Sequence, residues 1–307
     1  MSLDADLLID RQRLKRRLAF WRVLAVVAVV LALILVARPS GRFGGGALGQ
    51  HIERFRITGL IGDGQKTIEQ LNKLANDNAV AAVLLHLDTP GGQVSGGEGI
   101  HQAVAALAAK KPVVAVLDGT AASAGYMIAV AAPHIVSRAS TITGSIGVIL
   151  ETANFGGLLD KIGVSTDPLV SGPLKGQPSF DKPMTPEARA VLQAMIGDLF
   201  DQFVQLVAEG RHMDPAKVRQ LADGRAYTGR QALPLGLVDE LGGEPEALHW
   251  LETVRHVPAD LKVTEPDRRP WMARLTADSV SNIVTSAEQT LRVDGAWSVW
   301  QPFASRD

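Results

Sequence analysis

The chain has 307 residues and contains no cysteine. That absence excludes disulfide bonds, a thiol nucleophile and metal sites built from thiolates. The chain also lacks an excess of charge, because 31 lysines and arginines stand against 32 aspartates and glutamates. A nucleic-acid-binding domain would carry a basic excess, so the sequence gives no support to that class. No internal repeat is present, and the length suits one large domain or two small ones.

Apolar residues concentrate in one run near the N-terminus. Residues 18–37 are apolar apart from Arg22, and they are long enough to cross the core of a bilayer as a helix. Five basic residues lie between positions 11 and 17, whereas only Arg38 and Arg42 follow the run closely. The positive-inside rule then places the N-terminus in the cytoplasm and the body across the membrane. A cleaved signal peptide is the alternative, but the run is long for one and Arg38-Pro39 disfavours cleavage.

Strand-like and helix-like segments alternate in the first half of the remaining chain. Strands are predicted at 55–61, 80–87, 113–117 and 135–136, and helices at 66–75, 100–109 and 125–132. Residues 80–87 are almost continuously apolar, which is typical of a parallel strand covered on both faces. The alternation predicts a parallel α/β sheet.

The second half of the chain carries fewer strand signals. Further strands are predicted at 147–150 and 165–170, helices at 155–162, 187–209, 216–221 and 272–291, and a polar linker at 258–270. The helix at 187–209 has an apolar stripe at helical spacing. Residues 168–186 are rich in proline and glycine and are predicted to form a loop, yet this loop carries Lys175.

Ser123 stands in a run of small residues directly after the apolar segment 113–117. A serine on a sharp turn between a strand and a helix is the arrangement of a nucleophile elbow. Small neighbours let a substrate backbone approach the hydroxyl, and the start of a helix favours developing negative charge. A helix N-cap is the alternative role for such a serine.

A serine nucleophile needs a base, and the seven histidines of the chain form no evident triad. His86 and His134 lie in or beside apolar strands and are interpreted as structural residues. Asp118 is interpreted as a strand-end residue rather than as the acid of a triad. A lysine with a lowered pKa can act as the base instead, and Lys175 is the candidate, with an exposed loop lysine as the alternative.

Two glycine-containing motifs complete the set. The turn Asp88-Thr-Pro-Gly-Gly92 follows a predicted strand, and its glycines let a backbone amide face a reacting carbonyl. The segment Thr143-Gly-Ser-Ile-Gly147 places Ser145 between glycines. An ordinary turn is the alternative in both cases.

In their order and spacing, these motifs resemble the signal peptide peptidase A family, membrane-anchored Ser-Lys proteases with the spiral-sheet fold of the Clp proteolytic subunit and the crotonases. The resemblance covers residues 80–243. It implies that Ser123 is the nucleophile, that Lys175 is the general base and that Ser145 orients the lysine. It also implies that the N–H groups of Gly92 and Ala124 form the oxyanion hole. Ala124 departs from the glycine of many relatives but still offers its amide.

The resemblance further implies a serine endopeptidase that degrades cleaved signal peptides, without a metal or organic cofactor. It implies a location in the bacterial inner membrane and an assembly of several copies into a ring or dome. The expected organisation is a cytoplasmic segment at 1–17, an anchor at 18–37, a flexible linker at 38–50, a protease domain at 51–256 and a C-terminal extension at 257–307. The alternatives are a crotonase-like CoA enzyme and a catalytically silent membrane scaffold of the same fold.

Overall fold

The computed structural model describes residues 21–22, 25–27 and 49–265. The chain divides between Gln50 and His51 into two units, and the architecture given below is that of the second unit. Residues 21–22 and 25–27 are helical and exposed. The rest of the predicted anchor, most of the linker and the predicted helix at 272–291 lie outside the described residues.

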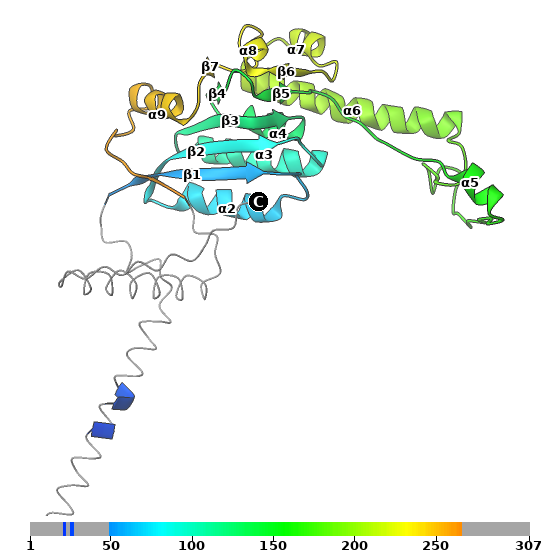
Figure 1. Cartoon of the computed structure of the whole chain (residues 1–307), viewed down its shortest axis with the longest axis horizontal. Helices are drawn as coiled ribbons and strands as arrows, with labels where there is room; N and C mark the ends of the chain where they lie inside the picture. Colours follow the sequence, from blue (N-terminus) through cyan, green and yellow to red (C-terminus); the bar gives the residue numbers. More distant parts are fainter. Residues whose placement is uncertain (1–20, 23–24, 28–48, 266–307) are drawn as a thin grey trace, which may run out of the picture. The chain divides into compact units, whose positions relative to one another are not determined.

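The second unit is a mixed α/β domain (Figure 1). Its strands are β1 (His51–Thr58), β2 (Val80–Thr89), β3 (Val113–Ala122), β4 (Ile135–Ser137), β5 (Ile142–Gly144), β6 (Ala226–Thr228), β7 (Glu240–Leu241) and β8 (Val263–Thr264). Its helices are α2 (Gln65–Asn76), α3 (Val94–Ala108), α4 (Ala124–Ala129), α5 (Gly156–Lys161), α6 (Pro186–Arg211), α7 (Pro215–Leu221), α8 (Gly229–Ala232) and α9 (Glu244–Thr253).

The sheet is parallel except at one pair of strands. Its main path runs β6-β5-β3-β2-β1-β8, and only β5 and β6 are antiparallel among the described strands. Strand β3 has two successive neighbours on its far edge: β4 pairs with residues 115–117 and β5 pairs with residues 120–122. The end of β3 is therefore held by a different strand from its beginning.

Two apolar layers cover the sheet. One face packs against α2, α3 and α4, with Leu85, Leu117 and Tyr126 fully buried. The opposite face packs against α9, with Leu84 and Val116 buried against Leu251. The alternation of side chains along each strand explains how neighbouring residues serve the two layers.

Helix α4, which begins directly after Ser123, is buried along its whole length. The hydroxyl of Tyr126 donates a hydrogen bond of 2.7 Å to the carbonyl of Leu237, and burial raises the pKa of this tyrosine. At the other end of α4, Gly210 of α6 lies against the carbonyl of Val130 so closely that a Cβ atom would stand 2.1 Å from the oxygen. These contacts hold the helix that follows the serine.

Residues 150–185, here called the arm, join β5 to α6. None of them is buried, and α5 is the only regular element they contain. Figure 1 shows α5 beyond the N-terminal end of α6, away from the sheet. The arm folds on itself, since the amide of Phe155 donates to the carbonyl of Phe180 and the hydroxyl of Thr166 donates to Asp181.

The sequence predicted most elements correctly but misplaced two strands. Residues 147–150 and 165–170 form no strand, because neither segment has a neighbouring strand to pair with. Helix α3 begins six residues before its predicted start at residue 100, because its glycines pack rather than form a loop. A Cβ atom at Gly97 would lie 2.8 Å from that of Ala124, so this glycine lets α3 approach α4. Residues after 256 also join the sheet, since β8 pairs with β1.

Among the described helices, α6 is long and apolar enough to cross a membrane by length and composition. Its C-terminal half carries Phe203, Val204 and Val207, which are buried in the core of the domain. The C-terminal half of α6 therefore packs in the core of the domain.

Two alanine substitutions in α6 test the packing of this helix. Gly210→Ala is expected to lower the free energy of unfolding by about 1–3 kcal/mol, because the new methyl group meets a backbone oxygen that cannot rotate away. Gly197→Ala meets nothing within 4 Å and is expected to raise that free energy by about 0.5–1 kcal/mol. Urea unfolding of the two full-length variants measures the difference, and equal free energies would contradict the contact with Val130.

Candidate active site

Ser123 occupies a strained backbone position at the end of β3. Its φ of 53° and ψ of −123° lie in a region that side-chain-bearing residues rarely adopt. The position is held on both sides: the amide of Ser123 donates to the carbonyl of Gly144 at 2.9 Å, and the carbonyl of Ser123 accepts from Met127 at 2.9 Å. The side chain makes no capping hydrogen bond to α4. The hydroxyl is therefore presented by the backbone without being used by the helix.

The turn at Gly91 and Gly92 lies directly against this serine. A Cβ atom at Gly91 would stand 2.8 Å from that of Ser123, and the φ of Gly91 is 110°. Gly92 is pinned from the other side, where a Cβ atom would stand 2.1 Å from the carbonyl oxygen of Ile61. Ile61 holds the turn through two hydrogen bonds of 2.9 Å, one to the carbonyl of Gly91 and one from the amide of Gln93. Only glycine fits these two positions.

Two amides beside Ser123 remain available. Gly92 and Ala124 have N–H groups that donate to no acceptor among residues 49–265. Gly92 is in the turn that touches the serine, and Ala124 is the first residue of α4. The start of α4 adds the partial positive charge of a helix N-terminus. Together these features suit the stabilisation of a negatively charged oxygen.

Ser123 and Ser145 line the same cavity, which has a volume of about 350 Å³. Its other lining residues are Gly147, Val148, Ile149, Gln193, Ile196, Gly197, Phe200, Ala222, Asp223 and Gly224. Ser145 has a φ of 48°, its amide donates to Arg225 O at 3.0 Å and its hydroxyl donates to Gly224 O at 3.3 Å. The cavity is therefore mainly apolar, with the two serines on its wall.

Lys175 lies outside this group. It is exposed on the arm, where its amide donates to the carbonyl of Gly172 at 3.0 Å, and it is not among the residues that line the cavity. Within one copy of the chain, the structure thus brings together Ser123, Ser145, Gly92 and Ala124, but not Lys175.

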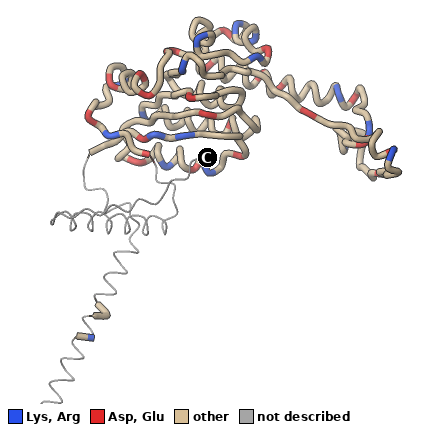
Figure 2. The backbone as a smooth tube through the Cα atoms, in the orientation of Figure 1, with Lys and Arg blue, Asp and Glu red and all other residues tan. Residues whose placement is uncertain are grey.

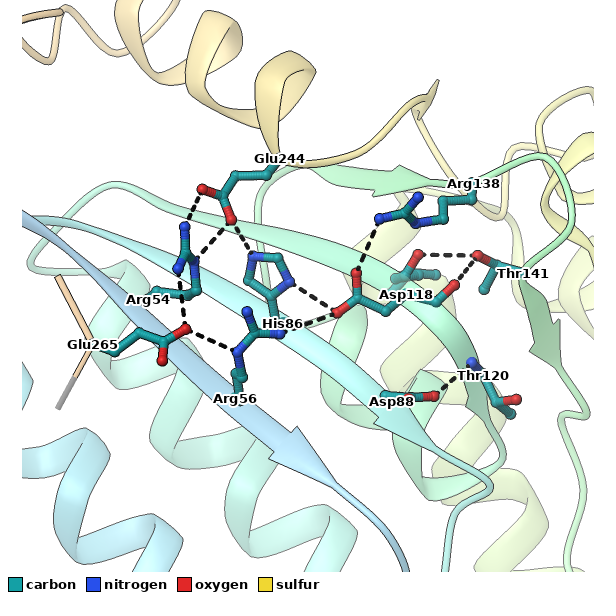
Figure 3. A network of polar contacts seen from close by, with 11 residues as sticks. Arg54, Arg56, His86, Asp88, Asp118, Thr120, Arg138, Thr141, Glu244 and Glu265 are labelled. Carbon is teal, nitrogen blue, oxygen red and sulfur yellow. Dashed lines mark hydrogen bonds and ion pairs between the residues drawn. The ribbon is translucent and has the colours of Figure 1, made fainter. Parts of the chain in front are cut away.

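The two histidines considered in the sequence are engaged elsewhere. His86 is buried, with Nδ1 2.9 Å from Asp118 and Nε2 3.1 Å from Glu244 (Figure 3). His134 stacks on Trp250 with ring centroids 4.7 Å apart. Neither histidine lines the cavity at Ser123. The interpretation of both as structural residues agrees with these contacts.

The carboxylates around His86 also contact arginines. Arg54 forms a two-pronged contact with Glu244 and a further one of 3.0 Å with Glu265 (Figure 3). Burial alone would raise the pKa of Glu244, but the hydrogen bonds from Arg54 outweigh it and hold that pKa below its usual value. This network joins β1, β2, β3 and α9, and thus fixes the polar part of the sheet face beside α9.

The chain is similar to known proteins over most of the described domain. A family model described as peptidase family S49 matches residues 105–258, which include Ser123, Ser145 and Lys175. The chain belongs to peptidase family S49, and it is a serine peptidase. The resemblance to the signal peptide peptidase A family proposed from the sequence is thereby confirmed, since a matching relative also carries that name.

Two S49 relatives show how much of the chain is shared. A protein named as a protease in Synechocystis sp. is 42% identical over 241 residues, which are 77% of this chain and 86% of that protein. A protein named as signal peptide peptidase SppA in Enterococcus faecium is 37% identical over 223 residues, which are 67% of this chain and 64% of that protein. The chain thus spans less than two thirds of the second relative.

A solved structure supports the fold of this S49 peptidase. A mutant of the 1510-N membrane-bound stomatin-specific protease matches with a TM-score of 0.50 and 17% identity. The match covers 72% of this chain and 100% of that chain. It shows the mixed α/β fold alone.

Sequence reasoning missed the residues that shape the cavity. Three residues of α6 line it but lie outside the apolar stripe predicted for this helix, namely Ile196, Gly197 and Phe200. Ile61, which pins Gly92, gave no sequence signal, because its role depends on backbone atoms. The available signal was the apolar character of Ile196 and Phe200, which extends the apolar surface of the helix beyond the predicted stripe.

Gly92→Ala is expected to lower kcat/KM for peptide hydrolysis by about 100-fold or more, because a methyl group there must displace the backbone of Ile61 and with it the Gly92 amide. The matched control is Gly62→Ala, where a Cβ atom meets nothing within 4 Å. Steady-state kinetics on folded samples compares the two. Activity of Gly92→Ala within a few-fold of the control would show that the turn tolerates displacement.

Proposed function

We propose that this S49 peptidase is a membrane-anchored endopeptidase that degrades cleaved signal peptides, with Ser123 as nucleophile and Lys175 as general base. The observation that carries the proposal is the strained, uncapped Ser123 beside two available amides. A serine that serves only as a helix cap has no need of such a backbone, whereas a nucleophile that must reach out of a turn does.

The proposed reaction has two stages. Neutral Lys175 takes the proton of the Ser123 hydroxyl, and the serine oxygen attacks the peptide carbonyl. The amides of Gly92 and Ala124 stabilise the resulting oxyanion, and the protonated lysine gives its proton to the leaving amine. Water, activated by the same lysine, then releases the acyl group from Ser123. Ser145 orients the lysine, because Ser145 lines the same cavity as Ser123.

The cavity supports an apolar peptide as substrate. Val148, Ile149, Ile196 and Phe200 line it, so burial of an apolar substrate side chain is favoured. Residues 146–154 make no backbone hydrogen bond to another described backbone segment, so their backbone groups are open to pairing with an extended peptide. Signal peptides have apolar central regions, and one relative is named as a signal peptide peptidase.

The position of Lys175 supports an assembly in which one copy completes the site of another. The arm that carries this lysine exposes large apolar side chains, namely Leu150, Phe155, Leu158, Ile162, Val164, Leu169, Val170, Leu174 and Phe180. Leu169 alone is 97% exposed. Such a surface is favoured when it is buried against another protein surface. A ring or dome of copies would bury the arm and bring Lys175 to a neighbouring Ser123.

The proposed location is the bacterial inner membrane, with residues 18–37 as a single span and the catalytic domain on the outer side. In the described domain, charges of both signs are intermixed along the chain, as Figure 2 shows. A tether at the bilayer would keep the active site near signal peptides that remain in the membrane.

Substitution of the dyad tests the proposed chemistry. Ser123→Ala and Lys175→Ala are each expected to reduce kcat by about 10³-fold or more, and Lys175→Arg is expected to be no better, because arginine stays protonated and cannot accept a proton. Peptide hydrolysis by the folded variants is the measurement. Substantial turnover by Lys175→Arg would require another base.

Mixing two inactive variants tests whether the dyad is shared between copies. Ser123→Ala and Lys175→Ala chains, co-expressed with different tags and purified together, are expected to recover activity, since some sites receive Ser123 from one copy and Lys175 from another. The control is the double variant, which carries both Ser123→Ala and Lys175→Ala, co-expressed with either single variant. It should stay inactive, because no site can then contain both residues. Co-assembled single variants that stay inactive would place both residues of each site in one copy.

Removal of residues 1–44 tests the role of the anchor. The shortened protein is expected to fold and to cleave a soluble peptide, because the described domain begins after the predicted linker. Cleavage of signal peptides embedded in vesicles should fall much further than cleavage of the soluble peptide. Equal losses on the two substrates, from a correctly assembled protein, would contradict a purely localising anchor.

A further inference from the structure

The pairing of β2 with β3 is interrupted at the catalytic end of the sheet. Leu87 pairs with Leu117, and the next pair is Thr89 with Ala121. Between these pairs, β2 has a single residue, Asp88, whereas β3 has Asp118, Gly119 and Thr120. The extra residues of β3 form a bulge just before the strand reaches Ser123.

Side chains contact three backbone groups in and beside this bulge (Figure 3). The amide of Thr120 donates to Oδ1 of Asp88 at 3.0 Å. The hydroxyl of Thr141 contacts the carbonyl oxygens of Leu117, at 3.0 Å, and of Asp118. A Cβ atom at Gly119 would lie 3.0 Å from Oδ1 of Asp88, so the carboxylate rests directly on the bulge.

The bulge lies where β3 changes its neighbouring strand from β4 to β5. After it, residues 120–122 pair with β5, and this pairing continues into the hydrogen bond from Ser123 to Gly144. Asp88 itself is the second-last residue of β2, directly before Thr89 and the turn that ends at Gly92. Its carboxylate therefore joins the turn that holds one proposed oxyanion amide to the strand that presents the nucleophile.

Thr89, the next residue, adds a second link of the same kind. It is fully buried, and its hydroxyl accepts a hydrogen bond of 3.1 Å from the amide of Gly91. Its methyl group packs on Gly125 of α4, where a Cβ atom would lie 2.6 Å away. Asp88 and Thr89 thus contact the strand before the serine and the helix after it.

We propose that Asp88 is a positioning residue for the peptidase reaction: its carboxylate, through the amide of Thr120, sets the distance between the Gly92 amide and Ser123. The inference rests on the proposed roles of Ser123 and Gly92. Because Asp88 is exposed, water can replace its carboxylate, and the fold is expected to survive the loss of the side chain. The geometry of the oxyanion hole then loosens although the core remains intact.

Kinetics of three variants of the full-length protein test this role. Asp88→Ala is expected to lower kcat per active site by about 10- to 100-fold with KM within about twofold, since small misplacements of catalytic groups cost rates of this order. Asp88→Asn keeps an acceptor oxygen for Thr120 and is expected to stay within about threefold of the parent. Asp88→Glu keeps the charge but moves the carboxylate by one methylene, and it should behave like the alanine variant.

The matched control is Asp77→Ala, at the opposite end of β2. Asp77 is likewise exposed, and its Oδ1 accepts from the backbone amide of Ala79 at 2.9 Å. The control should leave kcat per site unchanged. Active sites are counted by titration with a fluorophosphonate, so that loss of folded enzyme lowers the count and not the rate per site.

Parental kcat in Asp88→Ala, or a change confined to KM, would overturn the proposal. Equal damage in Asp88→Asn and Asp88→Ala would also overturn it, because the hydrogen-bond acceptor would then not be the determinant. If the alanine variant does not fold, the test is the comparison of kcat per active site between Asp88→Glu and Asp88→Asn. Parental kcat in the glutamate variant then overturns the proposal. Ser123→Ala is measured in parallel: its activity would refute the proposed function, whereas an inactive Ser123→Ala beside a fully active Asp88→Ala refutes the positioning role only.

Discussion

The close approach of two backbones is the constraint on which the rest of the structure depends. The turn at Gly91 lies against Ser123 at a distance that leaves no room for a side chain, and Gly92 is pressed against Ile61 in the same way. This contact places two available amides beside one serine hydroxyl. The sheet, with β5 holding the end of β3, and the buried helix α4 keep the approach fixed.

The strained conformation of Ser123 is stable because its surroundings determine it. A side-chain-bearing residue in such a conformation costs about 1–3 kcal/mol. Hydrogen bonds to Gly144 and Met127 hold the residue from both sides, and α4 is anchored in turn by Tyr126 and by its contact with Gly210. Stability of the domain and presentation of the proposed nucleophile therefore depend on the same contacts.

The domain separates structural polar groups from reactive ones. His86, Asp118 and Glu244 form a polar cluster on the α9 side of the sheet, together with Arg54. A histidine next to an aspartate resembles part of a catalytic triad, but no serine joins this pair among the described residues. In contrast, Ser123 and Ser145 face a cavity whose other residues are mostly apolar. A serine peptidase with this arrangement needs a base from elsewhere in the assembly, and the base proposed above is Lys175 of the arm.

Much of this organisation could be predicted from the sequence because it follows local rules. Apolar runs located β2 and β3, and the helical stripe located α6 to within a few residues. The small residues around Ser123 and the glycine pair at 91 and 92 indicated the site. Strands at 147–150 and 165–170 were wrong, because strand formation needs a partner that the sequence does not specify. The bulge opposite Asp88 and the contact of Gly92 with Ile61 depend on register between distant segments, which no local pattern encodes.

The most direct test of the central claim is a structure of the assembled full-length protein with a peptide phosphonate bound covalently. We predict a bond from phosphorus to the Ser123 oxygen, a phosphonyl oxygen about 2.7–3.1 Å from the amides of both Gly92 and Ala124, and a Lys175 amine next to the serine oxygen. An adduct on another residue, or a phosphonyl oxygen turned away from these two amides, would contradict it.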